Sequence, residues 1–351
     1  MSSYRLAIVR WSDNDELAES ISAELSALGH QPILFAHNAA IPSPVDVVLT
    51  FAPYDRWWPI ARQIPARSCT ADRPIFAHWN FEGQPSQNLP PGLTFGLSAI
   101  RSGIDRLNDS THAWWRGLVQ RGPLAVINRS MYKFRYMGEY AFALQQRILD
   151  VLIESSQVYA DRYRQQGQPV QQISWGTAPN WHADLKLKRD IDVVWLGKRR
   201  SRQRSRNLDR LRRELAAAGI ELYLIDNIER PFVFRAERIE IFNRAKITLN
   251  LLPTAGDNCF PYRFHQAAGN RSLVISEPLI SHDACYVAGY HYAASPIESM
   301  ADTIKYYLQH EAERAEIAEN AYRLVTTELT LRNSLAAVIE AVEVFQSSLK
   351  R

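Results

Sequence analysis

Short apolar runs alternate with longer amphipathic segments in the first part of the chain. The runs that predict strands are residues 4–9, 32–35, 45–51 and 73–78. Between the first two, the apolar residues of segment 17–28 recur at helical spacing, and Gly29 ends the predicted helix. This alternation predicts an α/β domain with a parallel sheet.

The acidic segment Asp13-Asn14-Asp15 lies between the first predicted strand and this helix. Its spacing matches the DxD pattern that can bind a metal ion. However, acidic residues directly before an amphipathic helix are typical of a helix cap, and Asp13 with Glu16 fits a capping box. We therefore predict a cap at this position and no metal site.

The middle of the chain has a less regular pattern. Residues 84–130 carry Pro, Gly, Ser and Asn with scattered aromatic residues, which predicts long loops and short helices. The regular elements expected after them are helices at 141–149 and 156–163 and strands at 151–153 and 172–176. The polar segment 177–189 then indicates a boundary between two domains.

The alternation of strands and helices resumes after that boundary. The predicted strands are residues 191–197, 221–225, 247–251 and 273–276. A helix is expected at 208–218, and the pattern is helical from residue 297 to a final helix at 330–349. The chain is therefore expected to contain two α/β domains, residues 1–170 and 176–325, with a cleft between them.

Length and composition are compatible with two soluble domains. The 351 residues are 46% apolar and 22% charged, which is ordinary for globular proteins. No apolar run reaches the roughly 18 residues of a membrane-spanning helix, and the start of the chain does not resemble a secretory signal. Cys69, Cys259 and Cys285 are odd in number and far apart, which argues against disulfides or a zinc site. These observations predict a cytoplasmic protein.

A basic stretch gives the mild net charge of +4 an uneven distribution. Residues 198–213, KRRSRQRSRNLDRLRR, contain nine basic residues and one acid. Such a stretch could be a solvated helix face, or it could bind phosphate, nucleic acid or an anionic membrane. Because Gly197, Lys198 and Arg200 directly follow a predicted strand, phosphate binding is favoured. Neither a P-loop nor a dinucleotide-binding fingerprint is present.

The segment RFHQAAGNRSLVISE (263–277) combines a polar helix start, small helical residues and a buried strand. A helix that begins near Arg263 would point its backbone amides at a ligand above the sheet. Ala267, Ala268 and Gly269 would let it lie close to its neighbours. A tightly packed structural helix would explain these small residues equally well, but not Arg263 and Gln266. Glu277 ends the strand that follows.

Residues 242–277, FNRAKITLNLLPTAGDNCFPYRFHQAAGNRSLVISE, resemble the nucleotide-sugar-binding region of group 1 glycosyltransferases of the GT-B fold. They are most similar to the spore-maturation (CgeB-like) branch, and residues 299–335 resemble the closing helices of that branch. The resemblance covers roughly residues 140–340 and the first half only in outline. It implies two Rossmann-like domains facing a cleft, with residues 330–351 packing back toward the first domain.

The resemblance also implies roles for individual residues. Arg263 matches the arginine expected to hold a donor phosphate, and Lys198 and Arg200 lie where relatives place phosphate-binding cations. Gln266 stands where the family usually has a glutamate that contacts the donor ribose. Asn258 stands where many relatives have the first glutamate of a pair that recognises the sugar.

Other positions match the family pattern only in part. Gly176 matches the glycine of the turn between the domains, although Ser174 replaces its proline. Arg271 stands where the family prefers glycine. Glu277, at the end of its strand, is placed to contribute to the donor site.

The first half offers one candidate general base and many aromatic side chains. Among its histidines, His78 is the best placed because it ends a predicted strand, although a structural histidine is an equal alternative. Most of the aromatic residues are expected to pack in the core or loops. Some could stack on an acceptor sugar or, with Lys133 and Arg135, rest on a membrane surface.

The predicted function is transfer of a sugar from a nucleoside-diphosphate donor to an unknown acceptor, without a required metal or other cofactor. The acceptor could be a glycan, a lipid or a protein, and nucleic acid is not expected because no recognised motif accompanies the basic stretch. The alternative is a catalytically silent protein of the same fold that binds a nucleotide or glycan. Asn258 and Gln266, amides in place of carboxylates, favour that alternative.

Overall fold

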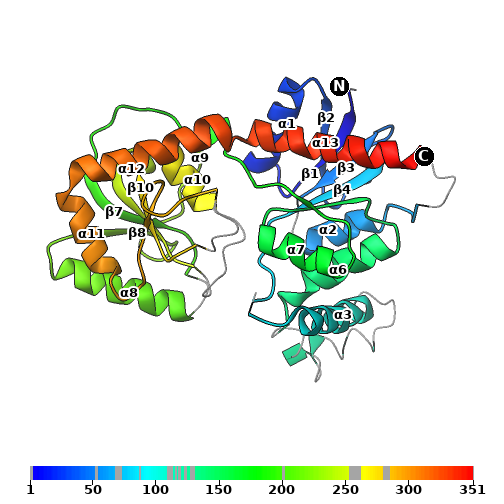
Figure 1. Cartoon of the computed structure of the whole chain (residues 1–351), viewed down its shortest axis with the longest axis horizontal. Helices are drawn as coiled ribbons and strands as arrows, with labels where there is room; N and C mark the ends of the chain where they lie inside the picture. The colour runs from blue at the N-terminus through cyan, green and yellow to red at the C-terminus, as the bar shows by residue number, and fades with distance from the viewer. Residues whose placement is uncertain are drawn as a thin grey trace. The chain divides into compact units, whose positions relative to one another are not determined.

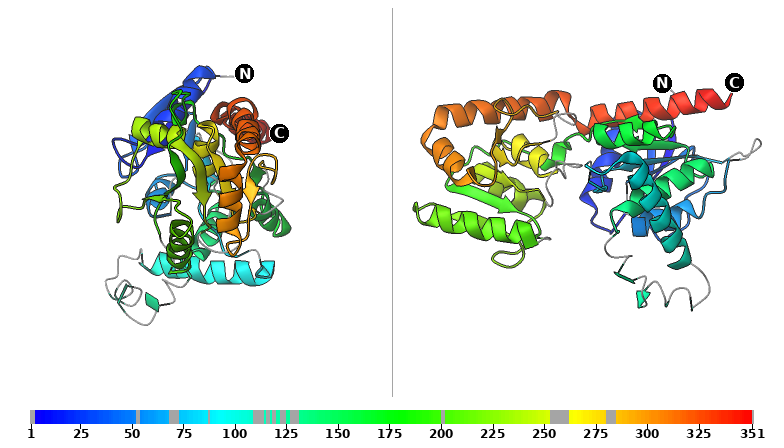
Figure 2. Two further views of the ribbon diagram at one scale, coloured as in Figure 1. Left: turned by 90° about the vertical axis from the view of Figure 1, so that its left-hand side faces the viewer. Right: turned by 60° about the horizontal axis from the view of Figure 1, so that its bottom comes forward.

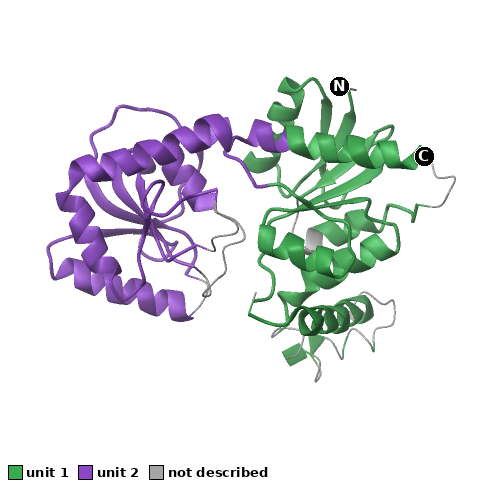
Figure 3. Ribbon diagram, in the orientation of Figure 1, with its two compact units in different colours: residues 1–173, 336–351 green, residues 174–335 purple. Residues whose placement is uncertain are grey.

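The computed structural model of the chain contains two compact units (Figure 3). Unit 1 comprises residues 1–173 and 336–351, and unit 2 comprises residues 174–335. The structure describes a few positions between 114 and 126 and the following segments: 3–51, 54–67, 73–86, 88–108, 131–199, 202–252, 262–279 and 285–350. Asn258 and Arg200, both predicted site residues, lie outside the described residues.

Unit 1 is built on a six-stranded parallel sheet with the strand order β2-β1-β3-β4-β5-β6. Its strands are β1 (Arg5–Arg10), β2 (Gln31–Ala36), β3 (Val47–Thr50), β4 (Ile75–Asn80), β5 (Val151–Glu154) and β6 (Gln171–Gln172). Every residue of β3, β4 and β5 is buried, as expected for central parallel strands that helices cover on both faces. The parallel sheet predicted from the sequence is therefore confirmed, although β6 is shorter than the strand predicted at 172–176.

Helices connect and cover these strands (Figure 1). They are α1 (Glu16–Ala27), α2 (Tyr54–Ala61), α3 (Pro91–Asn108), α6 (Phe134–Gln145), α7 (Gln157–Gln165) and most of α13 (Leu331–Leu349). The predicted cap of α1 is present, but Asp15 provides it: its Oδ1 accepts hydrogen bonds from the amides of Leu17 and Ala18, each at 3.1 Å. The capping box that we predicted for Asp13 with Glu16 is wrong by two residues.

Helix α3 lies where the sequence predicted only loops and short helices, and that prediction is wrong. Its buried face is mostly polar: one apolar residue, Ile104, is buried there with Thr94, Ser98, Arg101, Ser102 and Asp105. Its outer face is apolar: Leu93 is 51% exposed and Ile100 is 56% exposed. The polar face packs on α6, where Ser102 donates a hydrogen bond to Glu139. Amphipathic patterns are normally read with the apolar face inward, so this inverted helix gives a misleading signal.

Unit 2 has a five-stranded parallel sheet with the order β11-β10-β9-β7-β8. Its strands are β7 (Ile191–Leu196), β8 (Leu222–Ile225), β9 (Ala245–Asn250), β10 (Leu273–Ser276) and β11 (Ala293–Ala294). The four longer strands agree with the sequence prediction to within a few residues at each end. The second α/β domain is therefore confirmed as a parallel sheet.

Two apolar cores lie on the two faces of this sheet, beneath helices on opposite sides (Figures 1 and 2). The helical elements are η1 (Pro179–Trp181), α8 (Arg202–Ala216), α9 (Arg235–Arg244), α10 (Tyr262–Gly269), α11 (Met300–Gln309), α12 (Glu311–Arg323) and η3 (Leu324–Glu328). Leu208, Leu211 and Leu215 of α8 belong to one core, and Phe264 and Ala267 of α10 belong to the other. No helix within the described segments is long and apolar enough to cross a membrane.

The two ends of unit 2 are hydrogen-bonded to each other. The Thr177 amide donates to the Leu329 carbonyl at 2.8 Å, and the Leu331 amide donates to the Thr177 carbonyl at 2.9 Å. The Ser334 hydroxyl also donates to the Ser174 carbonyl, at 2.8 Å. A Cβ atom at Gly176 would collide with the backbone carbonyl of Thr330. Only glycine therefore fits at position 176 without moving one of the two segments.

Replacement of Gly176 by alanine tests this close approach. The added methyl meets rigid backbone, so Gly176→Ala should lower the free energy of unfolding of unit 2 by about 1–3 kcal/mol. The measurement is urea unfolding of the full chain, followed by tryptophan fluorescence.

Gly96→Ala is the matched control for that experiment. Gly96 lies in α3, and a Cβ there meets no atom within 4 Å. Because alanine favours the helix over glycine, this variant should be more stable by up to about 1 kcal/mol. Equal stability of Gly176→Ala and the unsubstituted protein would contradict the proposed close approach.

Candidate functional site

The carboxyl ends of three neighbouring strands in unit 2 bring several predicted site residues together. Strands β7, β9 and β10 are adjacent and parallel, so their carboxyl ends lie together along one side of the sheet, which we call its carboxyl edge. Lys198 follows β7 and Glu277 follows β10, and α10 carries Arg263 to the same edge. Parallel α/β sheets bind their ligands at this edge.

Arg263 lies in the first turn of α10 and is anchored to the ends of two strands. Its Nε donates to the Leu196 carbonyl at 2.7 Å, and its Nη1 donates to Asn250 Oδ1 at 2.8 Å. The guanidinium also lies 5.4 Å from the centre of the Trp195 ring. Burial, with a smaller contribution from the charge of Arg204, lowers the pKa of Arg263 to about 9. Arg263 is therefore a cation at neutral pH.

Gly197 provides the space for this guanidinium. A Cβ atom at this position would collide with Nη2 of Arg263. Gly197 also has a φ of 153°, and its amide donates to the Ile225 carbonyl at 3.0 Å. The glycine that follows β7 therefore helps to place Arg263, because any larger residue would displace its guanidinium.

Arg204 is a second cation at this edge, and the sequence analysis did not identify it. It is in α8 and is almost fully buried. Its guanidinium donates to the Leu251 carbonyl at 2.8 Å and to the Lys198 carbonyl at 3.1 Å. It lies within the basic stretch, where nothing distinguishes it from neighbouring arginines except its place in the helical period with Leu208 and Leu211.

Glu277 places a carboxylate beside these cations. Its Oε2 accepts a hydrogen bond from the Leu252 amide at 2.8 Å. Burial raises the pKa of Glu277, and the amide and the charge of Arg204 oppose that effect. Glu277 therefore joins the ends of β9 and β10 in the predicted site.

Gln266 is 1% exposed, and its Nε2 donates no hydrogen bond to any group in the described part of the chain. A buried amide without an acceptor is unusual in a folded protein, since most such groups find a partner. Lys198, by contrast, has an exposed side chain. The predicted contacts of both residues with a donor stay predictions.

His265, between Arg263 and Gln266, has a structural environment. Its Nδ1 lies 2.7 Å from the Tyr286 hydroxyl, and the ring is fully buried. Burial lowers the pKa of His265 to about 3, and a hydrogen bond to the backbone of Trp175 opposes this. The neutral ring therefore fastens α10 to the start of unit 2 rather than carrying charge at the site.

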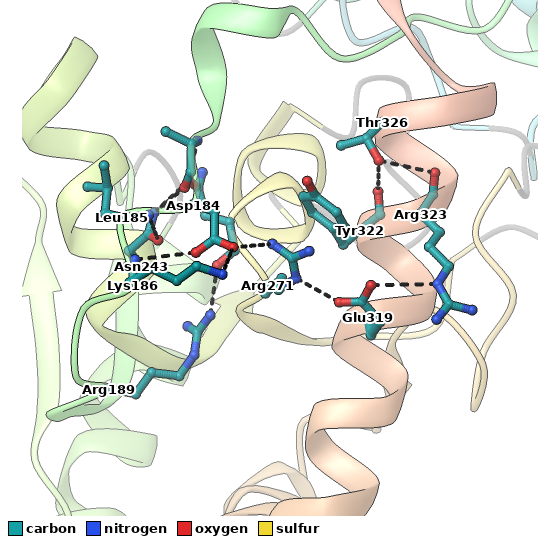
Figure 4. A network of polar contacts seen from close by, with 12 residues as sticks. Asp184, Leu185, Lys186, Arg189, Asn243, Arg271, Glu319, Tyr322, Arg323 and Thr326 are labelled. Atoms are coloured by element: carbon teal, nitrogen blue, oxygen red, sulfur yellow. Dashed lines mark hydrogen bonds and ion pairs between the residues drawn. The ribbon is translucent and has the colours of Figure 1, made fainter.

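Arg271, where the family prefers glycine, lies at the other end of α10 (Figure 4). Its φ of 55° explains that preference. Its Nε donates to Glu319 at 2.6 Å, and its guanidinium lies 3.4 Å from the centre of the Tyr322 ring. Asp184 is a further ion-pair partner at 3.4 Å. Arg271 precedes β10, so it lies at the opposite edge of the sheet from Arg263.

Ion pairs within the fold compensate part of the basic stretch 198–213. Arg199 pairs with Asp226 at 2.7 Å and with Asp209 at 2.6 Å. Arg212 pairs with Glu229 at 2.7 Å. Some of its cations are thus paired within the fold, and Arg204 reaches the carboxyl ends of the strands. Phosphate binding by this stretch stays a prediction.

His78 lies in unit 1, inside β4, and is fully buried. Its Nδ1 is 2.8 Å from the Thr50 hydroxyl, and its ring lies against Trp57 and Tyr140. Burial lowers the pKa of His78 to about 3, so the ring is neutral at neutral pH. Its Nε2 makes no hydrogen bond with the described residues. A catalytic role for His78 stays a prediction.

Metal-ligating side chains do not cluster in the described segments. No group of three or more His, Cys, Asp or Glu residues there is arranged to hold a metal ion. Of the three cysteines, Cys285 is described and is a free thiol.

Residues 199–340 match the protein family described as "Glycosyl transferase-like". Two solved structures are similar over nearly the whole chain. HepE from Anabaena, in complex with UDP-glucose, has 11% sequence identity and a TM-score of 0.57, covering 97% of this chain and 100% of that one. Sucrose-phosphate synthase from Thermosynechococcus elongatus has 11% identity and a TM-score of 0.58, covering 98% and 99%.

The chain has the GT-B fold. A glycosyltransferase from Rickettsia africae also matches, with 10% identity, a TM-score of 0.50 and full coverage of both chains. At these identities the likenesses show the fold alone, with its two Rossmann-like domains. Arg204, Asn250 and Arg263 lie within residues 199–340, the part that is similar to the "Glycosyl transferase-like" family. No curated protein matches the sequence.

Burial of His78 predicts a specific pH dependence of stability. The pKa of its ring falls from 6.5 in the unfolded chain to about 3 in the fold. Between these values the unfolded chain binds a proton that the native state does not, so stability falls as the pH falls from 6.5. At pH 5 the loss should be about 2 kcal/mol.

The measurement is urea unfolding of the full chain at pH 7 and pH 5, from which the stability of unit 1 is obtained. His78→Gln should remove about 2 kcal/mol of the difference between the two pH values, because glutamine does not titrate. His310→Gln, which changes an exposed histidine, is the matched control. Identical pH dependence in all three proteins would show that His78 is not buried as a neutral ring.

Proposed function

We propose that this protein transfers a sugar from a nucleoside-diphosphate donor, bound at the carboxyl edge of the unit 2 sheet, to an acceptor. The observation that carries the proposal is Arg263. It is a cation fixed at the ends of β7 and β9 by a carbonyl and an amide oxygen. No acidic side chain in the described part of the chain pairs with it. Its charge is therefore available to a ligand.

The departing nucleoside diphosphate gains negative charge as the bond to the sugar breaks. Arg263 and Arg204 lie at the ends of the strands where we propose that this charge develops, and α10 begins at the same end of the sheet. We propose that these groups take the place that a divalent cation has in other transferases, so that transfer needs no metal. Lys198 is exposed and lies two residues after the end of β7, and we propose that it adds a further positive charge for the diphosphate.

The acceptor is proposed to bind to unit 1 and to be a glycan, a lipid or a protein, with membrane contact as an open alternative. Membership of the spore-maturation (CgeB-like) branch is part of the same proposal and rests on the sequence resemblance alone. The solved structure of HepE in complex with UDP-glucose supports a nucleotide sugar as the class of donor.

A catalytically silent binding protein is the second candidate. Gln266 favours it, because an amide can hold a donor hydroxyl but cannot act as a base or a counter-charge. The unpaired Nε2 of Gln266 would be satisfied by a bound hydroxyl in either case. Binding of a nucleotide is thus common to both candidates, and turnover separates them.

Arg263→Ala should weaken the binding of nucleoside diphosphates. Loss of a charged hydrogen bond costs about 1.5–3 kcal/mol, which corresponds to roughly a 10- to 150-fold higher Kd. Arg263→Lys should have an intermediate Kd, because lysine keeps the charge but not the forked geometry. Isothermal titration calorimetry with UDP, GDP, TDP and ADP measures the effect.

Lys246→Ala is the control that matches the change in net charge. Lys246 is the second residue of β9, near the amino ends of the strands, where it pairs with Asp192 at 2.6 Å. Its removal should leave the Kd unchanged. An unchanged Kd for folded Arg263→Ala would remove Arg263 from the site.

Turnover is expected despite the two amides at positions 258 and 266. If phosphate stabilisation drives transfer, the protein should hydrolyse or transfer at least one nucleotide sugar, and Gln266→Glu should change donor Kd more than kcat. Release of nucleoside diphosphate across a panel of donors is the measurement. Tight nucleotide binding without turnover of any donor would instead establish the binding protein.

A further inference from the structure

We propose that Asn250 is a positioning residue, which fixes the guanidinium of Arg263 in the orientation that receives the donor diphosphate. The proposal rests on the proposed function of this edge of the sheet. Asn250 is the last residue of β9, and its Oδ1 accepts the hydrogen bond from Arg263 Nη1 at 2.8 Å. It was not among the residues that the sequence predicted for the site.

The direction of the Asn250 side chain is set by its neighbour on β10. Asn250 Nδ2 donates to the Ser276 hydroxyl at 2.9 Å, and that hydroxyl donates to the Glu277 carbonyl at 2.7 Å. A hydroxyl has one hydrogen, so Ser276 must accept from Asn250. The amide group therefore turns its oxygen toward Arg263, and a flipped amide would break both hydrogen bonds.

An amide is suited to hold this arginine without cancelling its charge. An aspartate at position 250 would form an ion pair with Arg263 and compete with the phosphate of a donor. An alanine would leave Nη1 without its acceptor, and the side chain would be free to take other rotamers. Asn250 accepts the hydrogen bond from Nη1 and leaves the positive charge of Arg263 available to the ligand.

The remaining contacts leave one edge of the guanidinium without a protein acceptor. Nε is bound by the Leu196 carbonyl and Nη1 by Asn250, whereas Nη2 lies over Gly197 and donates to no group in the described segments. Gly197 supplies space but no hydrogen bond. Nη2 is thus the nitrogen of Arg263 that Asn250 and Leu196 leave for a ligand.

The matched pair of variants is Asn250→Ala and Thr248→Val. Thr248 precedes Asn250 by two residues on the same face of β9, and its hydroxyl lies 2.7 Å from that of Ser272. Each variant removes one side-chain hydrogen bond between β9 and its neighbour, but only Asn250→Ala removes a contact with Arg263. Similar losses of stability are expected for both.

Ligand binding should separate the two variants. Asn250→Ala should raise the Kd of UDP by roughly 3- to 10-fold, with no change in the Kd of uridine, which has no phosphate. Thr248→Val should leave both values unchanged. Asn250→Asp should weaken UDP binding at least as much, because it neutralises the arginine. A normal Kd for UDP in Asn250→Ala would overturn the proposal.

A double-mutant cycle distinguishes positioning from a general structural effect. If Asn250 acts only through Arg263, then Asn250→Ala should have no effect on the Kd of UDP in an Arg263→Ala background. Additive losses would show that Asn250 does not act through the arginine, and this result would also overturn the proposal.

A measurement without ligand keeps the test independent of the proposed function. Phenylglyoxal modifies accessible arginines, and the rate at Arg263 can be followed by peptide mass spectrometry. Release of Nη1 in Asn250→Ala should speed modification of Arg263 several-fold relative to Thr248→Val. If the unsubstituted protein binds no nucleotide, the donor site fails, but this rate still decides whether Asn250 holds Arg263. Equal rates in the two variants would overturn the positioning role.

Discussion

A guanidinium that is removed from water needs hydrogen-bond acceptors in the protein. A carboxylate acceptor neutralises its positive charge, whereas a neutral acceptor does not. Around Arg263 the acceptors are the Leu196 carbonyl and the amide oxygen of Asn250, both of them neutral. This constraint fixes the residue after β7, which must be glycine, and the residue that ends β9. At the carboxyl ends of the unit 2 strands, the neighbouring groups thus hold one partly buried cation without neutralising its charge.

The strands were predictable from the sequence because buried parallel strands are short, continuous apolar runs between turn residues. Helix α3 was not, since its buried face is mostly polar, with Ser102 donating a hydrogen bond to Glu139 of α6, and several of its apolar residues lie outside. Helix α9 was also missed. Its sequence, RAERIEIFNR, has few apolar residues, and Arg238 and Asn243 are among those that it buries. Tertiary partners, which no local pattern contains, decided both cases.

For the site, strand ends located Lys198, Glu277 and Arg263 correctly at one edge, because parallel strands bring their carboxyl ends together. Arg204 was hidden among other arginines, and only its alignment with the buried leucines of α8 distinguishes it. Asn250 had a weak signal: a polar residue at the end of an apolar strand, opposite a serine on the next strand. The sequence does not indicate the direction of the Asn250 side chain, which links that serine to Arg263.

Residues 174–335 begin and end at neighbouring points, where the Ser334 hydroxyl meets the Ser174 carbonyl, so unit 2 is topologically an insertion into the chain of unit 1. Recombination at these two points could replace the whole of unit 2 without interrupting the sheet of either unit. One junction lies outside helices and strands, but the other lies inside α13. Each residue gained or lost there would turn the rest of the helix by about 100°. Val338, Ile339 and Val342 would then leave their buried positions, so such exchanges must conserve the length of this helix.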